Sequence, residues 1–118
     1  MYYKELRDLF FDNNIEAHAP YQKVDKCLRE YVVIKDNGQA PTMDGNVNGW
    51  SSIQFFCYIP KDQYSKIEEF PEKIKELIKQ IENIKYTGNE TPVMFIDNVQ
   101  AYLKVIEYVV PHQLKGRR

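Results

Sequence analysis

The sequence predicts a single α+β domain, in which an antiparallel or mixed β-sheet of about four to five strands has two α-helices packed on one face. Three observations predict this class. Apolar residues repeat at intervals of three and four in one segment, they alternate with other residues in another, and short turn signals separate several strand candidates. Strands joined by short turns cannot be parallel neighbours, because a parallel pair needs a long crossover. At 118 residues the chain has room for one core, so we expect residues 1–118 to form one domain.

The first half of the chain contains one helix candidate and two strand candidates. Residues 2–14 place apolar side chains at helical spacing and end in a pair of asparagines, which favour a stop. Residues 15–19 alternate weakly before a proline and predict a short strand. Residues 31–34 are densely β-branched and run into an Asp-Asn-Gly turn signal. Residues 37–49 are rich in Gly, Asn and Asp, so we expect an extended loop there.

The longest strand candidate and the main helix come next. Residues 50–59 alternate as a strand does. Proline lacks the N–H group that a helix interior needs, so we expect the regular helix to begin at Pro71 and residues 65–70 to form a turn before it. Lys75 and Lys79 fall on its outer, solvent-exposed side. The inner side is an apolar stripe made of Ile67, Phe70, Ile74, Leu77, Ile78, Ile81 and Ile84.

Two further strands are expected after this helix. Residues 87–89, Thr-Gly-Asn, end the helical segment. The strands cover residues 91–96 and 101–110 and are joined around an Asp-Asn pair, and Pro111 stops the second of them. We expect residues 112–118 to form a flexible, locally basic tail.

Composition excludes several classes of function. The formal net charge of −1 argues against sequence-specific nucleic-acid binding, because a phosphate-binding surface normally shows a basic excess. The apolar runs are too short to span a bilayer, and the first residues lack the pattern of a secretory signal. Cys27 and Cys57 have no partner spacing, which favours reduced thiols in a protein made in the cytoplasm.

No spacing in the sequence predicts a catalytic, cofactor or metal site. His18 and His112 have no His or Cys at a metal-ligand offset. Cys57 lies among strand residues with large apolar side chains and reads as a core residue. Residues 44–49 resemble the start of a calcium loop, but Phe55 stands where that loop needs a bidentate glutamate. We therefore expect no catalytic residue, no cofactor and no metal, and a protein that is not an enzyme.

The second face of the sheet is the candidate interface. Alternation places Ile53, Phe55, Cys57 and Ile59 on one side of the long strand and the residues between them on the other side. The residues of the last strand divide between two sides in the same way. Alternation alone does not decide which side meets the helices. Either side is too apolar to stand in water, so we expect the long loop to fold over it or, in preference, an oligomer to cover it. The candidate interface residues are Trp50, Phe56, Tyr58, Tyr102, Ile106, Glu107 and Tyr108.

Glu107 is the one carboxylate within an otherwise apolar strand. Such a group can act as an acid or base in catalysis. A salt bridge at a sheet edge or between subunits is its commoner role, and we expect that role here.

In its order of elements, the chain resembles the tail terminator (tail-completion) proteins of long-tailed bacteriophages and prophages. Their pattern has a helix at the start, an apolar strand, a long strand and an amphipathic helix, and it closes with a Thr-Gly turn and a strand ending in a motif like I-E-Y-x-x-P. The matching segments here are residues 6–11, 31–34, 52–59, 74–84, 87–88 and 105–111.

This resemblance implies a structural virion protein made in the bacterial cytoplasm. It implies a homohexameric ring at the head-proximal end of the tail, which caps the tail tube and joins it to the head connector. Its partners would be further copies of itself, the tail tube protein and the head-closure or connector protein, with no membrane and no sequence-specific nucleic acid.

Three other readings remain open at the level of sequence. One is a phage head-closure or connector protein of similar size. Another is a small non-catalytic protein-binding module of ferredoxin-like shape, such as an antitoxin or immunity protein. The third is an enzyme or ligand-binding domain of that shape, with a pocket on the aromatic sheet face. A ring-sized species in solution would separate the terminator from the modules.

Overall fold

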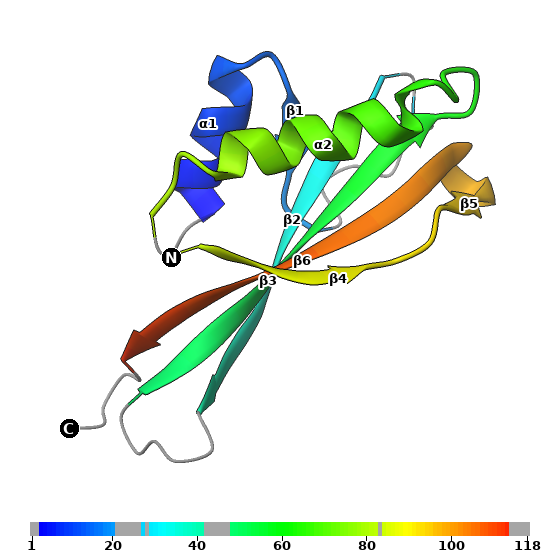
Figure 1. Ribbon diagram of the computed structural model, residues 1–118. Coiled ribbons are helices and arrows are strands. Elements are labelled where there is room, and N and C mark those ends of the chain that lie inside the picture. Colours follow the sequence, from blue (N-terminus) through cyan, green and yellow to red (C-terminus); the bar gives the residue numbers. More distant parts are fainter. Residues whose placement is uncertain (1–2, 21–26, 28, 42–47, 83, 114–118) are drawn as a thin grey trace.

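The computed structural model describes residues 3–20, 27, 29–41, 48–82 and 84–113. It contains two α-helices, a short 3-10 helix and a mixed six-stranded sheet (Figure 1). The predicted α+β class is confirmed, with one strand more than expected. The elements are α1 (Tyr3–Asp12), β1 (Glu16–His18), β2 (Tyr31–Pro41), β3 (Asn48–Pro60), α2 (Lys66–Ile78), β4 (Lys85–Glu90), β5 (Met94–Ile96), η1 (Asp97–Val99) and β6 (Ala101–Gln113).

Helix α1 ends where the sequence predicts. Asn14 adopts a left-handed conformation with φ of 61°, which asparagine tolerates better than most residues. The backbone N–H of Ile15 donates to the Phe10 carbonyl at 2.8 Å, so one of the last helical carbonyls is satisfied. This turn directs the chain into β1.

The sheet has the order β1-β2-β3-β6-β4, and β5 pairs with β6 beyond β4. Among the described strands, only the β1–β2 pair is parallel. The 13-residue strand β6 lies between β3 on one side and β4 and β5 on the other. Strand β6 therefore joins the two halves of the sheet.

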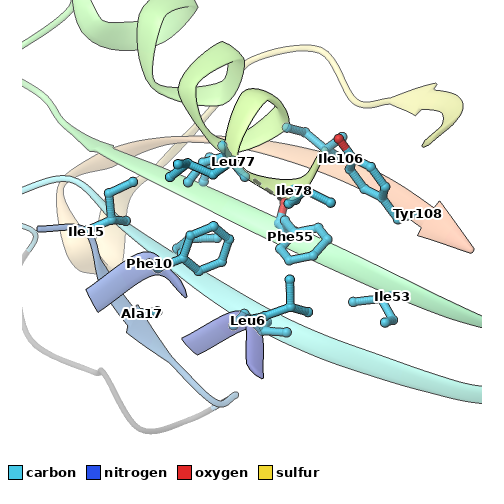
Figure 2. Packing of buried hydrophobic residues seen from close by; sticks show 14 of the residues in the cluster. Leu6, Phe10, Ile15, Ala17, Ile53, Phe55, Leu77, Ile78, Ile106 and Tyr108 are labelled. Carbon is cyan, nitrogen blue, oxygen red and sulfur yellow. Dashed lines mark hydrogen bonds between the residues drawn. The ribbon is translucent and has the colours of Figure 1, made fainter. Parts of the chain in front are cut away.

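One continuous core fills the space between the two helices and the sheet. Phe10 of α1 packs edge-on against Phe55 of β3 with ring centroids 6.1 Å apart, and Tyr108 packs on Phe55 at 5.3 Å (Figure 2). Leu6 and Ile74 are fully buried in the same cluster. Both helices thus lie on one face of the sheet, as the layer rule predicts.

The start of α2 differs from the prediction. The helix begins at Lys66, not at Pro71, and Pro71 lies inside it. Ile67 and Phe70 are buried together with Ile74, so the apolar stripe continues for a full turn before the proline. The burial of these two side chains outweighs the hydrogen bond that Pro71 cannot donate.

Residues 85–90 form strand β4, which the sequence did not predict. Helix α2 ends at Ile78, although Ile81 and Ile84 beyond it remain buried. Gly88 has φ of +87° and lies where the register between β4 and β6 shifts. The residues expected to end a helix therefore form a bulged edge strand.

Residues 37–41 and 48–49, which we expected in a loop, belong to strands. Strand β2 continues past its turn signal through a register shift between Asp36 and Gln39 and pairs with β3 as far as Pro41 opposite Gly49. Strand β6 continues to Gln113, so the first two residues of the expected tail are also in the sheet. The rest of the expected loop, residues 42–47, and of the tail, residues 114–118, lies outside the described residues.

These continuations form a three-stranded sheet extension, made of residues 40–41 of β2, 48–50 of β3 and 111–113 of β6. It projects away from both helices (Figure 1). The radius of gyration is 15.2 Å, compared with the ~13.5 Å expected for a compact chain of this length. The molecule is therefore elongated along the sheet.

Candidate functional site

The structure divides the seven candidate interface residues between the two faces of the sheet. Phe55 of β3 lies opposite Ile106 of β6, and Phe56 lies opposite Val105. Paired residues share a face, so the even-numbered residues of β6 lie under the helices. The expectation that Tyr102, Ile106 and Tyr108 share a face with Phe56 and Tyr58 was wrong, because the register between the two strands could not be read from either strand alone.

The three helix-face residues differ in accessibility. Ile106 and Tyr108 are buried in the core, so they are unavailable to a partner in this fold. Tyr102 is half-buried between the rings of Tyr64 and Phe95, with centroids 5.2 Å and 5.4 Å away. Of the three, only Tyr102 borders the surface.

The opposite face, which we call the open face, carries Phe56, Tyr58 and Glu107. Tyr58 stacks on Tyr31 at a centroid distance of 4.8 Å. At this end Cys27 covers part of the face, and its N–H donates to the Val99 carbonyl at 2.7 Å. Phe56 is half-buried further along, and Trp50 lies in the sheet extension opposite Ala40 and Pro111.

Glu107 accepts hydrogen bonds from three neutral side chains of the same chain. Its carboxylate lies 2.8 Å from Asn89 Nδ2, 3.0 Å from Ser52 Oγ and 3.2 Å from Thr87 Oγ1. The Asn89 hydrogen bond makes the largest contribution to lowering the pKa of this carboxyl below its ordinary value, and Ser52 and Thr87 add to it. Among the described residues these neutral donors hold the carboxylate in place of a salt bridge at the sheet edge, and a salt bridge between subunits stays a prediction. The three donors also keep Glu107 ionised. An ionised carboxylate suits an acceptor that fixes Thr87 and Asn89 of β4 better than it suits a proton donor.

A second polar cluster lies on the helix face and could not be found by spacing. Glu90 of β4 forms ion pairs with Lys75 of α2 and with Lys104 of β6, the latter at 3.0 Å, and Tyr86 donates to the same carboxylate. Partial burial on its own raises the pKa of Glu90, but the hydrogen bonds from these three donors lower it to about 2. Lys75 is therefore a bridging residue with a side chain only 19% exposed, contrary to its expected outer position.

The thiols are poorly placed for chemistry. Cys57 is fully buried, and burial is the main reason that its pKa is raised to about 12, so it stays protonated. Cys27 is buried as well. His18 lies 2.6 Å from the Glu16 carboxylate. Within the described part of the chain, no group of three or more His, Cys, Asp and Glu residues could hold a metal ion.

An open pocket of about 350 Å³ lies beside α1, at the base of the sheet extension. Its volume is within the range of small-ligand sites. Lys35 and Asp36 are its charged residues, and the rest of the lining is Tyr3, Leu6, Ala19, Pro20, Ile34 and Ile53. This largely apolar lining supplies neither a nucleophile nor a set of metal ligands.

Together these features define a mixed α+β domain whose distinctive surfaces are an aromatic sheet face and an uncovered sheet extension. No family model matches the chain, and no curated protein matches it. Neither helix in the described residues has the length and apolar character needed to cross a membrane.

Proposed function

We propose that this chain is a structural assembly protein of the tail-terminator type. In this proposal, copies of the chain form a ring that caps the tail tube of a long-tailed phage and joins it to the head connector. The resemblance in element order suggests the class. The observation that carries the proposal is the three-stranded sheet extension, because no helix or further strand among the described residues covers it.

A sheet is stable in water when at least one face is covered by another layer. In the described residues, β1 pairs with β2 only as far as Val33, and β4 joins β6 only from Val109. Ile34 and Val110, just beyond these points, are still buried in the core, and after them the sheet extension continues without a helix over either face in the described residues (Figure 1). Contacts with neighbouring subunits or with the tail tube would supply the missing layer.

The open face extends the same surface toward the body of the domain. Phe56 is half-buried, lies between Val33 and Val105 in the register, and carries no charge. Aromatic residues of this kind are enriched at protein interfaces. The proposal is therefore a non-catalytic protein whose contacts run from the open face onto the sheet extension.

The test is assembly with a tail tube protein of a long-tailed phage. We expect light scattering to report a ring-sized species, either alone or after the tubes are added. Electron microscopy should then show a ring at one end of each tube. Phe56→Asp and Trp50→Asp should weaken ring formation more than they lower the melting temperature.

Phe11→Asp is the matched control. Phe11 is 49% exposed on α1, a helix that belongs to neither surface, so this variant should assemble normally. A wild-type chain that stays monomeric with tube and connector proteins present would overturn the proposal. Rings that bind the connector but never a tube would indicate a head-closure protein instead. The element order α1-β1-β2-β3-α2-β4-β5-β6 differs from the β-α-β-β-α-β order of a ferredoxin-like domain. A small non-catalytic protein-binding module of another shape stays the alternative, and a wild-type chain that remains monomeric would favour it.

A further inference from the structure

Strand β5 presents an apolar open edge. Among the described residues it pairs only with β6, so its outer backbone groups have no strand partner. Val93, Met94 and Phe95 are 40%, 39% and 46% exposed, and no charge occurs from Val93 to Ile96. Three consecutive exposed apolar residues on an unpaired edge form a template for the addition of another strand.

The neighbouring strand on the same edge is protected. Strand β4 carries Lys85 and Glu90, and its register shifts around Gly88. Charges and bulges are the usual means by which proteins prevent edge-to-edge pairing. The absence of both from β5 contrasts with their presence a few residues earlier.

The other strand edges are protected too. The outer edge of β2 has a register shift after Asp36 and ends at Pro41. In the sheet extension, Pro111 has no backbone N–H group, so it interrupts the row of hydrogen-bond donors along the edge of β6. Strand β1 carries the ion-paired Glu16 and His18. Within the described residues, β5 is thus the one edge without a charge, a proline or a bulge.

The surroundings of β5 are apolar on both faces of the sheet. On the helix face, Phe95 packs edge-on against Tyr102, which contacts Tyr64, itself 67% exposed. On the open face, Met94 lies opposite the buried Leu103. A strand added beside β5 would therefore bury apolar side chains whichever way its own residues point.

We propose that β5 pairs in antiparallel register with β5 of a second copy of this chain. A second copy offers one unprotected edge within its described residues, which is its own β5, and so the contact is symmetric. Pairing centred on the middle residue sets Phe95 opposite Phe95 of the partner subunit. Because neither strand is charged, no like-charge repulsion opposes the contact.

The exposed area sets the strength of this pair. The side chains of Tyr64, Val93, Met94 and Phe95 leave roughly 300–400 Å² accessible, less than half of the ~800 Å² per partner in a standard interface. The dimer is therefore weak and reversible. A two-fold contact cannot close a ring by itself, so this inference is independent of the proposed function and uses a different surface.

Cysteine cross-linking tests the register directly. Opposed residues of an antiparallel pair have Cα atoms about 4.5–5.5 Å apart, within the range of a disulfide. Under mild oxidation, Phe95→Cys should cross-link to itself, and the yield should fall on dilution. Phe11→Cys, at a similarly exposed position on α1, should not cross-link, and the wild type controls for the two buried native thiols.

Sedimentation equilibrium tests the affinity without cross-linking. The mean mass of the wild type should rise from monomer toward dimer between micromolar and millimolar concentration. Phe95→Lys should weaken dimerisation by about tenfold or more, equivalent to about 1.4 kcal/mol or more. Phe11→Lys should leave it unchanged. Met94→Lys gives a second variant if Phe95→Lys fails to fold.

Three results would overturn the inference. They are a wild type that is monomeric at every concentration, dimerisation that survives both lysine variants, and hydrogen-exchange protection of β5 that appears only when tail tube protein is added. The last would assign the edge to another protein. If the Phe95→Lys variant still forms normal rings on tail tubes, the proposed function stands whichever of these three results is obtained.

Discussion

Lys75 of α2 and Glu90 of β4 form an ion pair that ties the main helix to the edge of the sheet. The same carboxylate accepts from Lys104 and Tyr86, so three elements meet at one side chain. Both partners of the pair are less than one-fifth exposed, which distinguishes it from an ordinary surface salt bridge.

We predict that Lys75→Ala lowers the free energy of unfolding by about 1–3 kcal/mol, because it removes a charged partner from a largely buried carboxylate. Lys79→Ala is the matched control on the same helix. Lys79 is 72% exposed and contacts Glu76, so its removal should cost no more than about 0.5 kcal/mol. Urea denaturation of both variants checks this difference. Equal losses would mean that the bridge contributes nothing beyond a surface pair.

The Glu90 pair also predicts a pH dependence. In the folded chain the pKa of Glu90 is lowered from 4.5 to about 2. A carboxyl with a depressed pKa stabilises the fold fully above its unfolded pKa and loses that contribution as pH falls through the folded value. The stability difference between wild type and Glu90→Gln should therefore shrink as the pH is lowered from 4.5 toward 2. A constant difference across this window in urea titrations would contradict the assignment.

The inner side of α2 and the turn after it should behave as core. Ile74 is fully buried, and Leu77 and Ile81 are 9% exposed. Replacing any of them by Ala removes buried methyl groups and leaves a cavity, so each change should cost about 2–5 kcal/mol. Denaturant unfolding measures this cost. Losses no larger than that of Lys79→Ala would show that these side chains are not packed as described.

Both thiols should be inert in the native state. Because Cys57 is fully buried with a pKa raised to about 12, and Cys27 is buried, neither offers a reactive thiolate near neutral pH. A disulfide-exchange reagent should label the two thiols at the rate at which the chain opens, and immediately once denaturant is added. Rapid labelling of the folded protein would contradict this.

The protein purified without added metal should contain no stoichiometric zinc or calcium. The ligand spacings that such sites require are missing from the sequence. Elemental analysis after gel filtration provides the measurement. One bound ion per chain would overturn the proposal of a purely structural protein.

Strong local patterns predicted their elements well. The stop of α1 at its asparagines and the division of β3 into two alternating sets of side chains both followed from spacing alone, because each depends on neighbours within a few residues. The face assignment of β6 failed for a different reason. Alternation divides a strand into two sets, but the pairing with β3 decides which set is buried, and a slip of one residue reverses the answer.

Other features depend on contacts that a single sequence does not reveal. Strand β4 reads as polar, with residues that favour a turn, and it becomes a strand because β6 is beside it. The Glu90 cluster joins residues from three elements, and no motif connects them. The extension of β2 through its Asp-Asn-Gly sequence likewise depends on pairing with β3.

The central position of β6 has a consequence for how the chain folds. Strands β3, β4 and β5 all precede it in the sequence and all pair with it. Until β6 has been synthesised, the edge of β3 that later pairs with it has no partner strand. The two short strands β4 and β5 then have no strand to pair with either. A pairing as distant in sequence as that of β3 with β6 forms slowly and leaves an unpaired strand edge exposed meanwhile. The newly made chain is therefore most vulnerable to misassociation in the interval before β6 pairs with them.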